Sequence, residues 1–319
     1  MVMKKEPTLQ KRLIIDTDPG VDDAHALILA LSQAAVQVEA ITTVAGNVSL
    51  EKTTRNALTV LEVAGKEVPV YAGCTDSLVH TPPRRAISHG SDGLGDAKFP
   101  PPRRSPEAEP AALALVRLTR QLPGGYTIVA IGPLTNLALA TRLDPALPQR
   151  VQRLVILGGV ISGRGNSWLP AAEFNFYLDP EAAFVVLENW NNILLVPWET
   201  VERHRLKADE LEELFAIESK KADFFRCTIQ QRMAQQLPLY GGVNEPDPLA
   251  VAIAMDESLI QKSERKAVTV ECQGSLTRGQ TIVDWNGILG KKPNAEIVLE
   301  IDQRRYVEML KQSLQVSGV

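Results

Sequence analysis

The sequence has few of the features that mark unusual classes of protein. Its three cysteines, Cys74, Cys227 and Cys272, are scattered and odd in number, which argues against a disulfide framework or a zinc site. It shows no signal peptide and no apolar run long enough to cross a membrane. A net charge of -4 with mixed signs leaves no basic surface for nucleic acid. We therefore expect a cytoplasmic protein that binds neither nucleic acid nor membranes.

Short apolar runs alternate with helical patterns along the chain. Residues 13–15 and 127–130 are typical of buried strands, and residues 50–64 have the spacing of a helix. Uninterrupted apolar strands separated by helices favour a parallel sheet covered on both faces. We predict one α/β domain over residues 1–319, with an open, mostly parallel sheet, helices on both faces and small extra β elements near the C-terminus. Residues 1–11 are expected to form a flexible tail.

Two segments interrupt this alternation. Residues 81–110 are rich in proline, arginine and glycine, and a loop of this length is usually functional or disordered. Residues 207–237 form a charged, glutamine-rich helical region that leads into a candidate hinge at residues 238–242. We expect the loop from Arg85 to Arg103 and the segment near Tyr240 to close over a bound substrate.

An acidic cluster follows the first predicted strand. Asp16, Asp18, Asp22 and Asp23 lie within eight residues, around a turn made by Pro19 and Gly20. One or two acids at a helix N-terminus need no explanation beyond capping. Four acids at the end of a buried strand repel one another unless a cation neutralises them. A hard divalent cation such as calcium accepts six to eight oxygen ligands, so the pattern favours a metal site over capping alone.

Further motifs follow at intervals along almost the whole chain. They are Ile-Thr-Thr-Val-Ala-Gly-Asn at residues 41–47, Gly-Pro-Leu-Thr-Asn at 132–136, Ala-Glu-Phe-Asn at 172–175 with Asp-Pro-Glu-Ala at 179–182, and Asp-Pro-Leu-Ala at 247–250. With the acidic run at residues 16–23, they resemble the inosine-uridine-preferring nucleoside hydrolase family in content and order. The acidic run and the Glu-Phe-Asn motif are the most specific of these blocks. The resemblance implies a nucleoside N-ribohydrolase of purine and pyrimidine salvage that is a homodimer or homotetramer.

The resemblance also implies a Ca²⁺ site and a ribose site. Calcium would be held by Asp18, Asp23, Asp247 and the backbone carbonyl of Ile131. Asp18 would also be the catalytic base that takes a proton from water on the metal. In the ribose site that the resemblance implies, Asp22 and Asn175 would bind the 2′-hydroxyl, and Asn47 and Asp247 the 3′-hydroxyl. Glu173 and Asn166 would bind the 5′-hydroxyl, and Phe174 belongs to the same sequence block as Glu173.

The sequence departs from the family pattern at the group that activates the leaving base. Family members that cleave purine and pyrimidine nucleosides have a histidine immediately before the last calcium aspartate, and this chain has Pro246 there. Proline cannot donate a proton. Two substitutes remain open: proton donation from Glu245, Tyr240 or His89, and stacking of the base on Trp168, Trp198 or Tyr240.

Two other functions remain possible at this stage. A phosphatase of the haloacid dehalogenase type also has an Asp-x-Asp at a strand end, but it needs a later lysine and a second acidic pair, and the Glu-Phe-Asn motif would have no role. A calcium-dependent nucleoside- or ribose-binding protein could keep the metal and ribose contacts and lack catalysis because of Pro246. A nucleoside is expected as the substrate of a hydrolase or as the ligand of such a binding protein.

Overall fold

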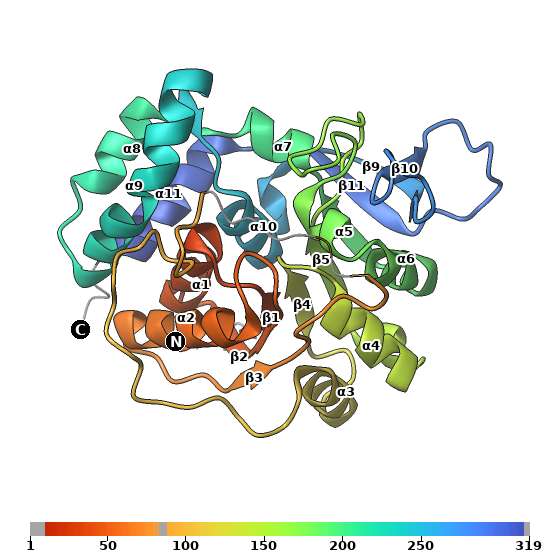
Figure 1. Ribbon diagram of the computed structural model, residues 1–319, viewed down its shortest axis with the longest axis horizontal. Coiled ribbons are helices and arrows are strands. Elements are labelled where there is room, and N and C mark those ends of the chain that lie inside the picture. The colour runs from red at the N-terminus through yellow and green to blue at the C-terminus, as the bar shows by residue number, and fades with distance from the viewer. Residues whose placement is uncertain (1–9, 81, 83–87, 316–319) are drawn as a thin grey trace, which may run out of the picture.

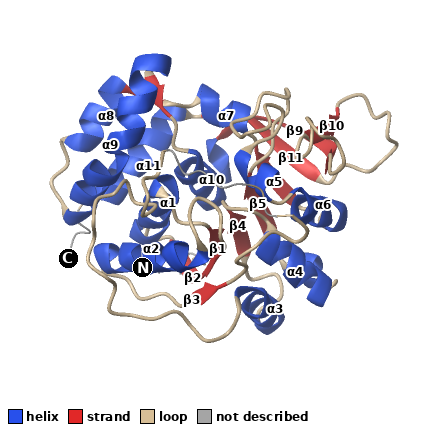
Figure 2. Ribbon diagram, viewed as in Figure 1, coloured by secondary structure: helices blue, strands red, loops and turns tan. Residues whose placement is uncertain are grey.

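A nine-stranded sheet forms the centre of the molecule, with strand order β10-β9-β11-β6-β5-β4-β1-β2-β3 (Figures 1 and 2). The computed structural model describes residues 10–80, 82 and 88–315. Most of the predicted N-terminal tail lies outside these residues, and Lys11 already begins β1. The strands of the central sheet are β1 (Lys11–Thr17), β2 (Val36–Thr43), β3 (Val70–Ala72), β4 (Thr127–Ala130), β5 (Arg153–Leu157), β6 (Ile193–Val196), β9 (Ile260–Val270), β10 (Thr281–Asp284) and β11 (Ala295–Ile301).

The predicted α/β class and mostly parallel sheet are confirmed. Every neighbouring pair from β3 across to β11 is parallel, whereas β9 pairs antiparallel with both β11 and β10. The extra β elements near the C-terminus therefore extend the main sheet. A separate two-stranded ribbon joins β7 (Leu206–Lys207) to β8 (Gly242–Val243).

Helices cover both faces of this sheet (Figure 2). Their bounds are α1 (Val21–Ser32), α2 (Leu50–Ala64), α3 (Ala111–Gln121), α4 (Thr135–Leu143), α5 (Phe174–Leu178), α6 (Pro180–Asn189), α7 (Trp198–Arg203), α8 (Ala208–Phe215), α9 (Lys220–Tyr240), α10 (Pro246–Met255) and α11 (Gln303–Leu314). None of the helices in the described part of the chain is long and apolar enough to cross a membrane.

The sheet separates two hydrophobic cores because side chains on a strand alternate between its faces. Leu13 and Ile15 of β1 pack into one core with α1, α2, α10 and α11. Ile14, between them, packs into the other core with α3, α4 and α6. A continuous apolar strand such as β1 is required where both faces are covered.

Three details differ from the sequence-based prediction. The sequence pattern near the C-terminus indicated strands at residues 267–272 and 280–284, but β9 begins earlier, at Ile260, and β11 was not predicted. Helix α9 continues through Pro238 to Tyr240 instead of ending before a hinge. Pro238 has no N–H to donate to the preceding turn, and the helix continues for only two residues beyond it. The helix ends at Gly241, whose φ of 66° lets its N–H bond to the Leu237 carbonyl.

The strand order places a crevice at the carboxyl ends of β1 and β4. The connection from β1 leads to β2 on one side, whereas β4 lies on the other side of β1. Open parallel sheets bind ligands at this kind of switch point, beyond the strand ends. The acidic run begins at the end of β1 and therefore opens into this crevice.

Candidate active site

Successive strand ends bring the predicted site residues together. Asp18 follows β1, Asn47 follows β2 and Ile131 follows β4. These three strands are neighbours in the sheet, so the side chains after them meet at one edge. All three residues are buried. Their placement results from the topology and could be anticipated from the strand pattern.

Two helices contribute the remaining polar groups. Glu173 is the N-cap of α5, and Asn175 lies in its first turn. Asp247 lies in the first turn of α10, directly after Pro246, which takes the first helical position. Proline is favoured at that position because its missing N–H would have no partner within the helix. Pro246 thus has a local structural role in orienting Asp247.

Three carboxylates form the centre of the site. Oxygens of Asp22, Asp23 and Asp247 lie within 4.8 Å of one another, and all three residues are buried. Burial and the charges of Asp22, Asp23 and Asp18 raise the pKa of Asp247 well above its ordinary value. Burial and the charge of Asp22 raise the pKa of Asp23 to about 6. This is the electrostatic conflict expected from the sequence.

Asp18 lies beside this group in a close-fitting backbone enclosure. Its Oδ2 accepts the Asn47 N–H at 2.6 Å, whereas its buried Oδ1 has no hydrogen-bond partner. Burial, followed by the charge of Asp23, raises the pKa of Asp18 well above its ordinary value. A Cβ on Gly132 would lie 2.7 Å from Oδ1, and one on Gly46 would lie 2.0 Å from Oδ2. Only glycine fits at these two positions.

Asp23 also has the capping role that a helix N-terminus predicts. Its Oδ2 accepts the Gly20 N–H at 2.9 Å and the Asn47 amide at 3.0 Å, and its Oδ1 accepts the Thr17 hydroxyl at 2.5 Å. Each carboxylate oxygen can accept more than one hydrogen bond. Capping and participation in a metal site are therefore compatible at this residue.

Asp16 is set apart from the other acids of the run. Its Oδ1 accepts hydrogen bonds from the Thr42 hydroxyl at 2.5 Å and the Asn136 amide at 2.8 Å. Burial raises its pKa to about 6 despite these two donors. Asn136 also donates to the Thr43 carbonyl, so Asp16 ties β1, β2 and α4 together beneath the site.

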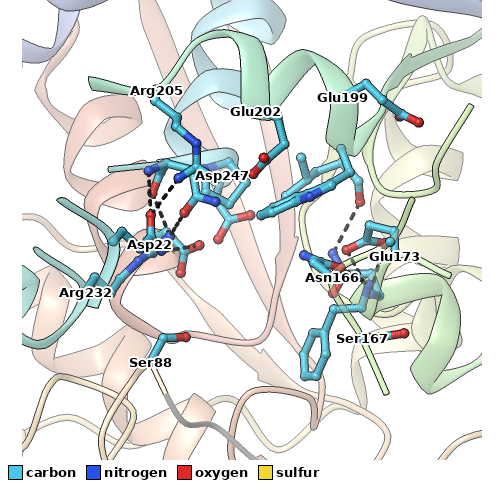
Figure 3. A pocket seen from close by; sticks show the side chains of 18 of the residues that line it. Asp22, Ser88, Asn166, Ser167, Glu173, Glu199, Glu202, Arg205, Arg232 and Asp247 are labelled. Carbon is cyan, nitrogen blue, oxygen red and sulfur yellow. Dashed lines mark hydrogen bonds and ion pairs between the residues drawn. The ribbon is translucent and has the colours of Figure 1, made fainter. Parts of the chain in front are cut away.

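A second polar group lies at the other side of the pocket (Figure 3). Glu173 accepts the backbone N–H groups of Asn175 at 3.0 Å and Gly159 at 3.1 Å, and burial raises its pKa to about 7. Asn166 accepts the Phe174 N–H at 2.8 Å through its Oδ1, which places it beside Glu173. The Asn175 amide donates to the Ile131 carbonyl at 3.0 Å.

Sequence reasoning missed Arg232, which enters the acidic cluster from α9. Its Nη1 lies 2.9 Å from Asp22 Oδ2 and 3.6 Å from Glu245 Oε1. Burial works against ionisation of Asp22, but the charges of Arg232 and His89 and the hydrogen bonds to the carboxylate together outweigh it, so the pKa of Asp22 is lowered. The one sequence signal was its helical spacing from Phe225 and Ile229, which places Arg232 on the buried face of α9.

The three candidate proton donors occupy different environments. His89 lines the cavity, and burial lowers its pKa to about 4. Glu245 is buried, with Oε2 2.7 Å from His25 Nδ1. Tyr240 is 59% exposed, and its ring lies under the Arg205 guanidinium at 4.3 Å. His25, the partner of Glu245, is also buried, and its Nε2 lies 2.8 Å from the Thr228 hydroxyl.

A cavity of about 980 Å³ connects the carboxylates to the second polar group. It is lined by the predicted substrate residues and by four aromatic side chains: Trp168, Phe174, Trp198 and Tyr240. Ser88 and His89 also line it, whereas Arg85 lies outside the described residues. Asn56 donates to the carbonyls of Pro19 and Asp92, both at 2.9 Å, and so links the described part of that loop to the acidic turn. Loop closure over substrate stays a prediction.

The sequence matches the family described as inosine-uridine preferring nucleoside hydrolase over residues 13–308. The chain belongs to this family. The nucleoside hydrolase resemblance based on the five sequence blocks is thereby confirmed. The match includes the acidic run after β1 and the Asp247 helix, and it leaves the phosphatase alternative without support.

Individual nucleoside hydrolases are similar over nearly their whole length. The pyrimidine-specific ribonucleoside hydrolase RihA of Salmonella agona is 35% identical, over 95% of this chain and 98% of the relative. The structure of an inosine-guanosine nucleoside hydrolase matches with a TM-score of 0.88 and 32% identity, over 96% of this chain and 98% of that one. A plant nucleoside hydrolase matches with a TM-score of 0.89 and 33% identity, over 96% and 99% of the two chains.

This nucleoside hydrolase is therefore an enzyme of ribonucleoside cleavage. The relatives include proteins named for pyrimidine bases and for purine bases. Members of the family are metal-dependent, and Asp22, Asp23 and Asp247 provide the acidic cluster that such an enzyme needs.

Proposed function

We propose that the enzyme hydrolyses the N-glycosidic bond of a purine or pyrimidine ribonucleoside in a calcium-dependent reaction, and releases free base and ribose. The observation that carries this proposal is the crowding of Asp18, Asp22, Asp23 and Asp247 at the switch point of the sheet. Two of these residues, Asp22 and Asp247, line a cavity of about 980 Å³, which is large enough for a nucleoside.

Asp18, Asp23, Asp247 and the Ile131 carbonyl would hold the calcium ion. The donor set suits a hard cation because all four groups offer oxygen. The unpartnered Oδ1 of Asp18 supports this assignment, since a buried acceptor without a donor is costly. Arg232 contributes one positive charge to the cluster, which leaves an excess of negative charge for a divalent ion.

Asp18 would act as the general base. Calcium, when bound, supplies positive charge that favours loss of a proton from water. The Asp18 carboxylate takes that proton while the water oxygen attacks the anomeric carbon of the sugar. The neighbouring carboxylates favour the positive charge that develops on the ribose as the glycosidic bond breaks.

The two polar groups of the cavity would hold opposite ends of the ribose (Figure 3). Asp22 and Asn175 would bind the 2′-hydroxyl, and Asn47 and Asp247 the 3′-hydroxyl. Glu173, with Asn166 beside it, would bind the 5′-hydroxyl, and its pKa of about 7 suits either acceptance or donation of a hydrogen bond. Both Glu173 and Asn175 are fixed through the backbone of α5, which keeps this contact in place.

The base would lie among the aromatic side chains of the cavity. Trp168 and Trp198 line it together with Tyr240, and Pro246 takes the position of the family histidine. Aromatic rings favour stacking with a planar base. We therefore propose that stacking on these residues, in place of a histidine proton donor, favours departure of the base.

A panel of nucleosides assayed for released ribose, with and without a calcium chelator, tests this function. We expect ribose from at least one of inosine and uridine, loss of activity with the chelator, and recovery with added calcium but not magnesium. Binding of nucleosides without hydrolysis of any of them, including p-nitrophenyl riboside with its good leaving group, would instead support a binding protein. Activity that persists in chelator would contradict the role of calcium.

The expected homodimer or homotetramer and the cytoplasmic location also stay predictions. Light scattering on the purified enzyme would measure its mass against the 34.9 kDa of one chain.

A further inference from the structure

Arg232 is the one lysine or arginine that is buried among the residues the structure describes. Its side chain reaches from α9 into the acidic cluster, where it contacts groups on two segments, α1 and the residues just before α10. Nη1 lies 2.9 Å from Asp22 Oδ2 on α1 and 3.6 Å from Glu245 Oε1. Nη2 donates to the Asn244 carbonyl at 2.6 Å and to its side-chain oxygen at 2.9 Å. Arg232 is 3% exposed, and the ion pairs of Nη1 together with the hydrogen bonds of Nη2 fix the orientation of its guanidinium.

Asp22 has one oxygen held by Arg232 and one without a hydrogen bond. Its Oδ1 is buried and has no donor among the described residues. His89 Nδ1 lies 3.5 Å from Oδ1, but this nitrogen already accepts the Val21 N–H at 3.1 Å and so does not donate to Asp22. A buried carboxylate oxygen without a donor favours a ligand that brings one. Because Asp22 lines the cavity, that donor can be a substrate hydroxyl.

The same geometry also places the Asp22 carboxylate where it could act as a metal ligand. Its carboxylate lies with those of Asp23 and Asp247 inside a 4.8 Å cluster, and a divalent cation could use all three. The ion pair with Arg232 occupies one Asp22 oxygen and offsets its charge. Arg232, which lies beside Asp22 in Figure 3, thus forms an ion pair with this carboxylate.

We propose that Arg232 is a positioning residue that holds Asp22 as the acceptor for the ribose 2′-hydroxyl and keeps it from acting as a calcium ligand. This inference rests on the proposed function. It makes Arg232, through Asp22, the residue that sets the preference for ribonucleosides over 2′-deoxyribonucleosides. Arginine is required because a lysine ammonium cannot reach Asp22, Asn244 and Glu245 as one planar fork.

Four variants test the proposal: Arg232→Met, Arg232→Lys, Asp22→Asn and the double variant Arg232→Met/Asp22→Asn. For each, kcat and KM are measured on a ribonucleoside that the wild type cleaves and on its 2′-deoxy counterpart. Calcium affinity is measured separately by titration calorimetry. Arg205→Met is the matched control, because Arg205 also lines the cavity but pairs with Glu202 and Gln236.

We expect Arg232→Met to reduce the ratio of kcat/KM values for ribo- and deoxynucleoside about tenfold or more, as loss of a hydrogen bond to a charged group does. Asp22→Asn should reduce it similarly, and the double variant should lose little more because both changes remove one interaction. Calcium should bind Arg232→Met as tightly as wild type or more tightly, since Asp22 is freed. Arg205→Met should leave the ratio unchanged.

Two results would overturn the inference and leave the proposed function standing. One is that folded Arg232→Met keeps the wild-type ratio of kcat/KM values for ribo- and deoxynucleoside while Asp22→Asn reduces that ratio. The other is that Arg232→Met binds calcium more weakly than wild type. An unchanged ratio in Asp22→Asn would instead refute the role assigned to Asp22 in the proposed function. If Arg232→Met does not fold, Arg232→Lys decides the question. It should reduce the ratio severalfold, and a wild-type ratio in that variant would contradict the proposal.

Discussion

His89 Nδ1 lies 3.1 Å from the Val21 backbone nitrogen, at the start of α1. A backbone N–H can only donate, so Nδ1 accepts and the proton of the neutral ring lies on Nε2. Burial lowers the pKa of His89 to about 4, which keeps the ring neutral near pH 7. A Cβ on Gly20 would lie 2.5 Å from this nitrogen, so the ring packs directly on the acidic turn. His89 is therefore suited to shape the cavity and to offer Nε2–H to a substrate.

A neutral His89 is not expected to be the general acid that protonates the leaving base. We predict that His89→Ala lowers kcat/KM for inosine and for p-nitrophenyl riboside by the same factor. The nitrophenyl compound needs no proton on its leaving group, so loss of a general acid would affect inosine alone. A loss confined to inosine would show that His89 is the acid after all.

Asp18→Asn should abolish hydrolysis and leave the fold intact. Burial and neighbouring carboxylates raise the pKa of Asp18, so an uncharged side chain of the same shape relieves repulsion. We expect kcat to fall at least about a hundredfold, the usual loss for a general base, with an unfolding temperature no lower than that of the metal-free wild type. Asp209→Asn, at an exposed position on α8, is the control. Near-normal turnover in Asp18→Asn would refute the assignment of the base.

Gly132→Ala should disturb the same carboxylate through the backbone. The added methyl would lie 2.7 Å from Asp18 Oδ1, so Asp18 must move. We expect calcium affinity, measured by calorimetry, to fall about tenfold or more, because ligand displacements of this size disrupt a metal site. Gly287→Ala, in open space at a φ of 72°, should lose some stability but bind calcium normally. Equal calcium affinity in the two variants would contradict the placement of Asp18 in the metal site.

Glu173 should make stability depend on pH in a predictable direction. Burial raises its pKa from 4.5 to about 7 in the folded protein. Between these values the folded state keeps a proton that the unfolded state has lost, so the free energy of unfolding falls as pH rises from about 4.5 to about 7. The shift corresponds to roughly 3 kcal/mol. Denaturant titrations across this range measure the free energy of unfolding of wild type and Glu173→Gln. The difference between the two proteins should shrink as pH falls, and a difference that is independent of pH would contradict the raised pKa of Glu173.

The sequence predicted the parts of the site that follow from strand ends. Asp18 comes directly after β1 and Asn47 lies in the loop that follows β2, and parallel strands bring such residues to one edge. The sequence also predicted the helix over 50–64 with its final residue, because Gly65 provides the left-handed cap at a φ of 63°.

Arg232 and β11 could not be predicted in the same way. Arg232 lies on the buried face of α9, one turn after Ile229, but an arginine at such a position is buried only because Asp22, Asn244 and Glu245 meet it in three dimensions. β11 alternates apolar and acidic residues only partly, and its partner strands β6 and β9 lie far away in sequence. Pro238 indicated a helix end at residue 237, but α9 continues three residues further, to Tyr240, before the Gly241 cap.

A crystal structure of the enzyme grown with calcium and an uncleavable nucleoside analogue tests the central claim most directly. The account predicts one ion ligated by Asp18, Asp23, Asp247 and the Ile131 carbonyl, with Asp22 against the 2′-hydroxyl and paired with Arg232. An analogue bound in the cavity with no ion between these carboxylates, or with Asp18 turned away from it, would contradict the account.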